Sequence, residues 1–323
     1  MQVLLTGAAG FIGSKVAEFL LAEGHHVVGV DNLNDAYDPR LKQHRLDGLL
    51  DRPGFDFARL DIVDRDALDH VCSGHEPFDV VVNLAARAGV RPSVSDPWAY
   101  VDTNMVGTLN LLELCRWRGV DKFVLASTSS LYGGSNPLPF SEDQDTSRPL
   151  SPYAASKKGA EALTYTYHHL HGIDVTVFRY FTVYGPAGRP DMSIFRFCRW
   201  IAEGDQVEVL GDGHQSRDFT YVDDIARGTI LGMRPLGYEV INLGSDEPHE
   251  LMRTIELIEQ ETGNKAELTF GPADKADVPA TWANVEKAKR LLGWESQVSL
   301  EEGIHRSVAW YRENRELARG LVL

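Results

Sequence analysis

The sequence predicts an α/β fold, with a doubly wound parallel sheet first and a smaller C-terminal α/β lobe after it. Short apolar runs alternate with longer amphipathic stretches up to about residue 180. Two of the runs are apolar throughout, which is typical of strands buried on both faces of a sheet. Beyond residue 180, glycine and proline break this alternation. We therefore expect one domain over residues 1–180 and a second lobe over residues 181–323, with segments near 215–245 returning to the first.

The elements of the first domain follow in chain order. We expect strands at residues 3–5, 26–30, 55–60, 79–83, 123–126 and 175–178. Apolar residues at helical spacing predict helices at residues 12–22, 98–116 and 153–171. In the second lobe we expect helices at residues 193–202 and 251–262, a strand at 206–210, a strand at 240–242 that returns to the first sheet, and a closing helix at 301–317.

Composition excludes several classes of function. The 323 residues carry a formal net charge of −15, which argues against a nucleic-acid or anionic membrane surface. No apolar run approaches the roughly 20 residues of a membrane span, and no charged, apolar leader opens the chain. The three cysteines are scattered and odd in number, so a cytoplasmic location is expected. No cluster with metal-ligand spacing is found, and no metal site is predicted.

A glycine-rich loop directly follows the first expected strand. Residues 6–13 read TGAAGFIG, which places Gly7, Gly10 and Gly13 between that strand and the helix at 12–22. Such glycines allow a tight turn, a close backbone approach, and close packing of the helix against the sheet. The free N–H groups and the positive dipole end of that helix favour a pyrophosphate. The loop therefore predicts a dinucleotide site.

An acidic residue, Asp31, ends the second expected strand, 18 residues after the last of these glycines. A carboxylate at this place accepts hydrogen bonds from both ribose hydroxyls and repels a 2′-phosphate. The next residues, Asn32 and Leu33, offer no arginine to such a phosphate, so we expect NAD rather than NADP. Asp61 and Ile62 follow the third expected strand and are placed to meet the adenine.

Tyr153 and Lys157 form a Y-x-x-x-K pair, so both side chains lie on one face of the helix at 153–171. Free tyrosine has a pKa of about 10, but a nearby ammonium favours the phenolate and lowers that pKa. Thr128, in the hydroxyl run that follows the strand at 123–126, can hydrogen-bond the same substrate hydroxyl. Alone, the pair is also typical of an exposed helix face. Combined with the glycine loop and Asp31, it predicts a catalytic centre.

With these residues in place, the chain resembles the extended short-chain dehydrogenases/reductases. The resemblance rests on the segments already described and on RDFTYVDD at residues 217–224. It implies a Rossmann-type sheet, NAD bound throughout the catalytic cycle, and a nucleotide-sugar substrate. It also implies a homodimer, in which two helices from each subunit, here near residues 98–116 and 153–171, form a four-helix interface.

The resemblance also assigns site residues. Cofactor contacts are expected from Gly7, Gly10, Phe11, Ile12, Gly13, Asp31, Asn32, Asn34, Asp61, Ile62, Leu84, Ala85, Ala86, Tyr153 and Lys157. Substrate contacts are expected from Arg91, Ser129, Ser130, Thr182, Arg189, Met192, Arg217 and Asp277. Arg217 is assigned to the diphosphate, Asp277 to the uridine ribose, and Arg189 to the uracil or the sugar acid. Arg91 stays open between a substrate ligand and a surface ion pair.

The residues after Thr128 indicate the reaction. Sugar 4,6-dehydratases of this family resemble T-D-E at this place and decarboxylating members T-S-E, whereas Ser129 and Ser130 stand here. Without a carboxylate, elimination is disfavoured, and oxidation followed by re-reduction at one carbon, a 4-epimerisation, is expected. Residues 31–38, 88–91, 180–185 and 188–192 resemble UDP-glucuronate 4-epimerases in particular. UDP-glucose 4-epimerases usually carry asparagine where Thr182 stands.

Other functions stay open. The nearest alternative is a 4-epimerase for UDP-glucose or UDP-N-acetylglucosamine. A non-catalytic NAD-binding regulator would typically have lost Tyr153 or Lys157, and both are present. Because NAD and a UDP-sugar acid are anions, we expect the cleft to be locally positive despite the net charge of −15.

Overall fold

A seven-stranded parallel sheet forms the centre of the first part of the chain. The computed structural model describes residues 1–272 and 278–323, and gives this sheet the strand order β10-β6-β5-β4-β1-β2-β3. Its strands are β1 (Gln2–Thr6), β2 (His26–Asp31), β3 (Phe55–Arg59), β4 (Val80–Asn83), β5 (Lys122–Thr128), β6 (Asp174–Tyr180) and β10 (Tyr238–Leu243). The strand expected at residues 240–242 is β10, and it does return to this sheet beside β6.

Helices cover both faces of the sheet, because side chains alternate along each strand. Val3 and Leu5 of β1 belong to one apolar core and Leu4 to another. The first core is closed by α1 (Phe11–Ala22), α2 (Pro39–Leu50), α9 (Val222–Leu231) and α11 (Glu286–Leu292). The second is closed by α3 (Arg65–Ser73), α6 (Gly107–Arg118) and α7 (Pro152–His171). The predicted doubly wound α/β fold is confirmed.

The helix expected at residues 98–116 is divided in the structure. After α4 (Val90–Ser95) and α5 (Pro97–Val101), a π-helical turn, η1 (Asp102–Val106), precedes α6. The turn holds Asn104, whose buried side-chain amide donates to Ser156 Oγ at 2.9 Å and to the Arg87 carbonyl at 3.0 Å. Single π turns are frequent at functional sites. Helical periodicity alone does not reveal such a turn.

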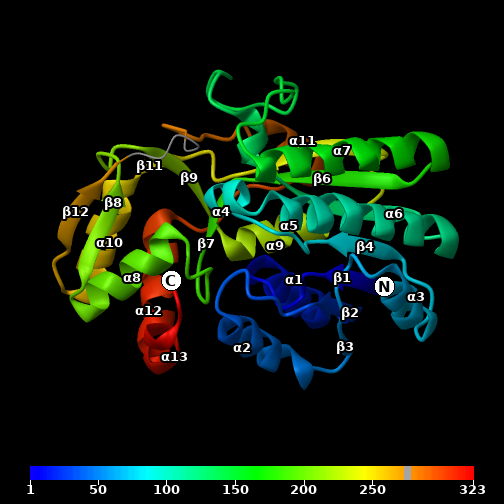
Figure 1. Cartoon of the computed structure of the whole chain (residues 1–323), viewed down its shortest axis with the longest axis horizontal. Coiled ribbons are helices and arrows are strands. Elements are labelled where there is room, and N and C mark those ends of the chain that lie inside the picture. Colours follow the sequence, from blue (N-terminus) through cyan, green and yellow to red (C-terminus); the bar gives the residue numbers. More distant parts are fainter. Residues whose placement is uncertain (273–277) are drawn as a thin grey trace.

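A smaller lobe with its own apolar core lies beside the sheet (Figure 1). It contains two small sheets, one of β7 (Thr182–Tyr184), β9 (Ser216–Tyr221) and β11 (Pro248–Glu250), the other of β8 (Gln206–Leu210) and β12 (Glu267–Gly271). Its helices are α8 (Ser193–Glu203), α10 (Leu251–Thr262), α12 (Leu300–Glu313) and α13 (Arg315–Gly320). The single closing helix expected at 301–317 is wrong in this respect, because Asn314 leaves the helical conformation (φ −112°, ψ 29°) and separates α12 from α13.

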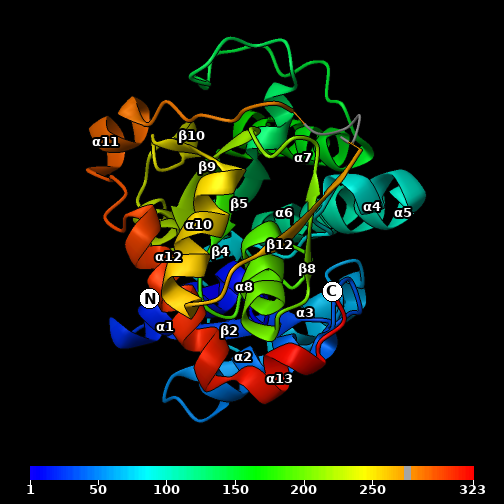
Figure 2. The same cartoon turned by 90° about the vertical axis from the view of Figure 1, so that its left-hand side faces the viewer.

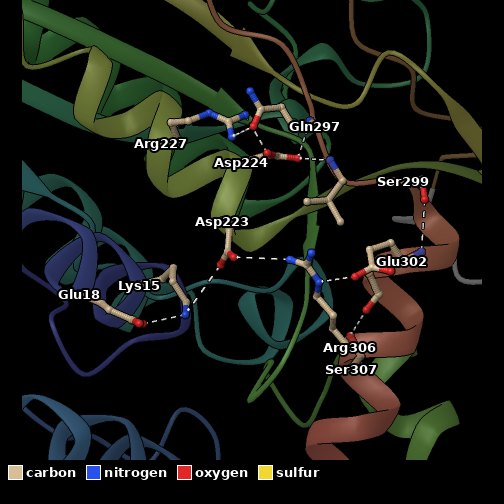
Figure 3. A network of polar contacts seen from close by, with 12 residues as sticks. Lys15, Glu18, Asp223, Asp224, Arg227, Gln297, Ser299, Glu302, Arg306 and Ser307 are labelled. Atoms are coloured by element: carbon tan, nitrogen blue, oxygen red, sulfur yellow. Dashed lines mark hydrogen bonds and ion pairs between the residues drawn. The ribbon is translucent and has the colours of Figure 1, made fainter. Parts of the chain in front are cut away.

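Polar contacts connect α9 to both parts of the molecule (Figure 3). Asp223 lies between two basic side chains. Its Oδ1 is 3.8 Å from the Lys15 ammonium on α1, and its Oδ2 is 4.0 Å from the Arg306 guanidinium on α12. The next residue, Asp224, is buried and accepts the backbone N–H of Gln297 at 2.9 Å. The segment that leads into α12 is thus fixed to a helix of the central sheet.

The C-terminal end of the chain packs near the beginning of α2 (Figure 2). The backbone N–H of Val322 donates to Asp38 Oδ2 at 3.0 Å, and Asp38 also caps α2. Among the helices described, none has the length and apolar character needed to cross a bilayer. The division at residue 180 into two domains stays a prediction.

Candidate active site

A cavity of about 630 Å³ lies at the carboxyl edge of the central sheet and is also lined by the smaller lobe. β1 and β4 are neighbours in this sheet, but the chain leaves them toward opposite edges. The crevice at their carboxyl ends is therefore a topological switch point, where open α/β sheets bind ligands. Every site residue expected from the sequence lines this cavity, except Asp277, which lies outside the described residues. The role of each of these residues stays a prediction.

The glycine loop fits between β1 and α1 only because its glycines lack a Cβ. Gly7 has a φ of +71°, and a Cβ on it would lie 2.7 Å from the backbone nitrogen of Ala85. A Cβ on Gly13 would lie 2.0 Å from the Gly7 carbonyl oxygen. The loop is further held by a hydrogen bond of 2.7 Å from the Gly7 N–H to the Val30 carbonyl. Close approach of backbone to backbone thus places the start of α1 at the cavity.

Asp31 ends β2 and is held from two sides. Its carboxylate accepts the backbone N–H of Ala9 at 3.2 Å and that of Leu33 at 2.8 Å. Lys42 of α2 lies 3.8 Å from Asp31 Oδ1 and donates to Asn34 Oδ1 at 2.9 Å. Burial lowers the pKa of Lys42, and Asp31 partly opposes this shift. The sequence interpretation missed Lys42. Only residues 32 and 33 were considered there, and they do not show which side chain of α2 lies beside the end of β2 in the fold.

The expected catalytic pair, Tyr153 and Lys157, lies in the first two turns of α7, where the local sequence favours the start of a helix. The Ser151 hydroxyl accepts the Ala154 N–H at 3.2 Å as N-cap, and Pro152 occupies the first helical position. One turn after Tyr153, the ammonium of Lys157 donates to the Ala126 carbonyl of β5 at 2.8 Å. The cap and this bond fix both side chains toward the end of β5, where Thr128 lies.

The environment of the pair shifts both pKa values. Burial raises the pKa of Tyr153, whereas the Thr128 hydroxyl and the Arg189 guanidinium act to lower it. Burial lowers the pKa of Lys157 to about 8, and the Glu161 carboxylate opposes this shift. Tyr100 packs edge-on against Tyr153, with ring centroids 6.0 Å apart. The tyrosine therefore lies in an apolar wall whose charged neighbours are basic.

A buried ion pair lies behind Lys157, and nothing in the local sequence beyond helical spacing indicates it. Glu161, one turn further along α7, is paired with Arg179 of β6 by two hydrogen bonds of 3.0 and 2.9 Å. Its carboxylate also accepts the Ser127 hydroxyl at 2.6 Å. Ser127 and Arg179, which are 34 and 18 positions from Glu161 in the sequence, thus bind one carboxylate because β5, β6 and α7 pack together.

The substrate side of the cavity is rich in hydroxyls and arginines. Ser129 and Ser130 lie in the short 3₁₀ turn after β5, where Thr128 Oγ1 accepts the Ser130 N–H at 3.2 Å. Thr182 opens β7 on the facing side. Arg189 is held by Asp191, with a hydrogen bond of 3.0 Å from Nε. Arg189 lines the same cavity as Tyr153, and its guanidinium acts to lower the pKa of that tyrosine.

Basic side chains outnumber acidic ones in this cavity, in a chain of net charge −15. Among the residues described, the lining contains six basic side chains: Lys42, Arg91, Lys157, Arg189, Arg196 and Arg217. It contains four acidic ones: Asp31, Asp61, Asp191 and Glu208. Arg196 and Glu208, which form an ion pair of 3.5 Å, were not found by sequence reasoning, because neither belongs to a recognisable motif. The cavity suits an anionic ligand.

The switch-point cavity and the glycine loop define a dinucleotide-binding α/β protein, with Tyr153 and Lys157 in the lining of the cavity. A family model described as "NAD dependent epimerase/dehydratase family" matches residues 3–244. The chain belongs to this NAD-dependent epimerase/dehydratase family.

Relatives and solved structures extend this comparison. The chain is 56% identical to a UDP-glucuronate 4-epimerase of Thermodesulfobacterium geofontis over 98% of both chains. It is 38% identical to the UDP-glucuronic acid 4-epimerase of Bacillus cereus, crystallised with UDP-glucuronic acid and NAD, with a TM-score of 0.91 over 97% of this chain and 99% of that one. A Thermotoga maritima UDP-glucose 4-epimerase, solved with UDP-glucose, is 33% identical, with a TM-score of 0.90 over 98% of this chain and 100% of that one.

Proposed function

We propose that the chain is a UDP-glucuronate 4-epimerase, which interconverts UDP-glucuronate and UDP-galacturonate with tightly bound NAD. One observation carries the choice of sugar: Thr182 lines the cavity of Tyr153 together with Ser129 and Ser130. Ser129 and Ser130 stand where an acid would be needed for elimination, and Thr182 stands where UDP-glucose 4-epimerases usually carry asparagine. The relatives named UDP-glucuronate 4-epimerase, at 56% and 38% identity, support the same choice.

The residues present fit NAD. Side chains at Gly7 or Gly13 would collide with neighbouring backbone, so the loop leaves its N–H groups and the start of α1 for a pyrophosphate. Asp31 and Lys42 lie at the end of β2, where they would hold the ribose hydroxyls, and Asp61 and Ile62 would meet the adenine. When bound, NAD supplies the chemistry of accepting a hydride from C4 of the sugar and returning it.

The protein's own part is to move one proton and to hold the sugar. The Tyr153 phenolate takes the proton of the 4-hydroxyl and later returns it to the oxygen on C4. The Lys157 ammonium stabilises the phenolate, and Thr128 hydrogen-bonds the same oxygen. Epimerisation requires the 4-keto sugar to present its other face to the nicotinamide side, so the cavity must bind both orientations.

The C5 carboxylate makes the 4-keto intermediate a β-keto acid, which is prone to lose CO2. We propose that Ser129, Ser130 and Thr182 hold this carboxylate in an unproductive orientation. Ser129→Ala and Thr182→Ala should weaken binding of UDP-glucuronate about tenfold each, the effect of losing a hydrogen bond to a charged group. Both should also raise the ratio of decarboxylated product to epimer, measured by chromatography of the UDP-sugars. Unchanged affinity and ratio in both variants would remove these hydroxyls from this role.

The function itself is tested by incubating the purified protein with UDP-glucuronate and, separately, with UDP-glucose. UDP-galacturonate should form from the first, and no UDP-galactose should form from the second. Conversion of UDP-glucose alone would identify a UDP-glucose 4-epimerase, as in the Thermotoga maritima relative. No conversion of either sugar, with NAD still bound, would indicate a regulator.

We also infer a homodimer and a cytoplasmic location. Trp98 (76% exposed), Val94 (63%) and Tyr165 (55%) are large apolar or aromatic side chains on α5, α4 and α7. Exposed apolar groups gathered on neighbouring helices are typical of a protein interface. They support the four-helix interface expected near residues 98–116 and 153–171. The three cysteines are free and buried, which suits a reducing compartment.

A further inference from the structure

Arg45 connects two loops of the site that lie far apart in sequence. It stands on α2, is only 7% exposed, and lies outside the cavity lining. Its guanidinium donates to the Ala9 carbonyl in the glycine loop at 3.3 Å. On its other side it donates twice to the Ala187 carbonyl, at 3.0 and 2.6 Å, and once to the Gly188 carbonyl at 3.4 Å. We call residues 185–189 the substrate loop, because this segment ends in Arg189.

Among the described residues, the hydrogen-bond acceptors and aromatic rings around this buried cation are all neutral. Besides the carbonyls, Arg45 donates to the Tyr37 hydroxyl at 2.7 Å, and the rings of Phe11 and Tyr37 lie 5.8 and 5.4 Å from its guanidinium carbon. A buried charge costs stability unless it is paired. An arginine that is held by neutral acceptors is therefore better explained by the need to hold these groups in fixed positions than by a contribution to stability.

The substrate loop needs such support. Ala187 adopts a φ of +52°, a left-handed conformation that is unfavourable for a residue with a Cβ. Its carbonyl is the one that accepts two of the Arg45 hydrogen bonds. Two residues later, Arg189 enters the cavity and donates to the Ala88 carbonyl at 3.4 Å. The backbone conformation at Ala187 therefore sets the direction in which the chain continues to Arg189 and the cavity.

We infer that Arg45 is a positioning residue that joins the glycine loop to the substrate loop, and so fixes Arg189 relative to the bound cofactor. The planar guanidinium can donate in several fixed directions at once, which a lysine ammonium on a flexible stem cannot reproduce. α2 gives Arg45 a rigid support, because its start is fixed by the C-terminal residues through Asp38. This inference rests on the proposed function for the role of Arg189, but not for the link between the loops.

The test compares Arg45→Lys, which keeps the charge, with Arg45→Met, which removes it. Both variants should raise the KM for UDP-glucuronate about tenfold, with a smaller change in kcat per NAD-loaded site. Both should also release NAD faster, measured as loss of bound NAD after dilution without sugar. Wild-type KM and NAD release in both variants would overturn the inference. Recovery of both values in Arg45→Lys alone would also overturn it, because charge rather than bridging would then be the cause.

A double-mutant cycle shows whether Arg45 acts through Arg189. In an Arg189→Met background, Arg45→Met should change the KM less than about twofold, because interacting residues are not additive. Full additivity would contradict the link. The control is Arg52→Met, just beyond α2. The Arg52 guanidinium contacts the Gly48 carbonyl and Glu18, away from both loops, so this variant should behave as wild type. If the wild-type protein converts no UDP-sugar, the proposed function fails, while the NAD-release measurement still decides the link between the loops.

Discussion

At the scale of single residues, the catalytic pair lies where burial opposes the ionised form of both members. The pKa of Tyr153 is raised and that of Lys157 is lowered to about 8. The groups that oppose these shifts are Thr128 and Arg189 for the tyrosine and Glu161 for the lysine. The pKa values of the pair therefore depend on neighbours from three different segments of the chain: β5, α7 and the loop that contains Arg189.

Tyr153→Phe should lower kcat for UDP-glucuronate by about 10³-fold, since proton transfer by a positioned side chain contributes roughly that much. NAD content and substrate affinity should stay within about twofold, because the ring and its contact with Tyr100 are kept. A coupled assay of UDP-galacturonate formation measures the rate. Tyr165→Phe, on the exposed part of the same helix, is the control. Retained activity in Tyr153→Phe would remove this hydroxyl from the mechanism.

Lys157 makes stability depend on pH in the NAD-free protein. Its folded pKa of about 8 lies below the ordinary value of 10.5, so between these values the unfolded chain binds more protons. Stability therefore rises with pH through this window, and below pH 8 the buried ammonium destabilises the fold in full. Lys157→Met should raise the free energy of unfolding at pH 7 by about 1–3 kcal/mol, while abolishing activity.

Urea unfolding of the NAD-free protein at pH 7 and above pH 10 measures this effect. The advantage of Lys157→Met should vanish at the higher pH, where the folded lysine is already neutral and the unfolded lysine is losing its proton. Lys158→Met, at the more exposed neighbouring position, should show no comparable change between the two pH values. An advantage of Lys157→Met that is independent of pH would contradict the assignment.

At the scale of elements, α9 connects the central sheet to the smaller lobe through two adjacent aspartates. Asp224 accepts the N–H groups of Gln297 and Val298 and the Ser296 hydroxyl, at 2.9 to 3.0 Å. Asp223 makes only the two long ion pairs shown in Figure 3, and its Oδ1 has no hydrogen-bond donor among the described residues. The two carboxylates therefore differ sharply in what they stabilise.

Asp224→Ala should lower the free energy of unfolding by about 2–4 kcal/mol, because four donors, the Arg227 guanidinium among them, lose a buried charged acceptor. Asp223→Ala should change it by less than about 1 kcal/mol, as expected for exposed or distant ion pairs. Urea unfolding monitored by tryptophan fluorescence compares the two variants. Equal effects would show that Asp224 does not fix the segment before α12.

At the scale of the whole molecule, the exposed faces of α4, α5 and α7 lie outside both main cores. Trp98→Glu should turn the proposed dimer into a monomer, because a charge would be buried at the centre of an apolar interface. Light scattering after gel filtration measures the mass, against 35.9 kDa for one chain. Trp117→Glu, exposed near the end of α6 beside Arg65, is the control. A wild-type mass of one chain would contradict the dimer directly.

The sequence by itself determined the fold class and most of the site. Buried strands and the glycine loop follow from local pattern, because a continuous apolar run and closely spaced glycines before a helix can both be recognised in consecutive residues. The Tyr153–Lys157 pair was found for the same reason, since its spacing is local. Local pattern did not reveal the π turn at 102–106 or the break at Asn314, where contacts of single side chains change the helix.

Only the tertiary structure decided which distant side chains share the site. Lys42 reaches Asp31, Glu161 pairs with Arg179, Arg196 pairs with Glu208, and Arg45 joins residues 9 and 187. None of these contacts corresponds to a fixed separation in sequence, because each depends on how helices, strands and loops pack together in the fold. The same packing explains how a chain of net charge −15 lines its cavity with more basic than acidic groups. Composition sums charges over the whole surface, whereas the fold decides which of them converge.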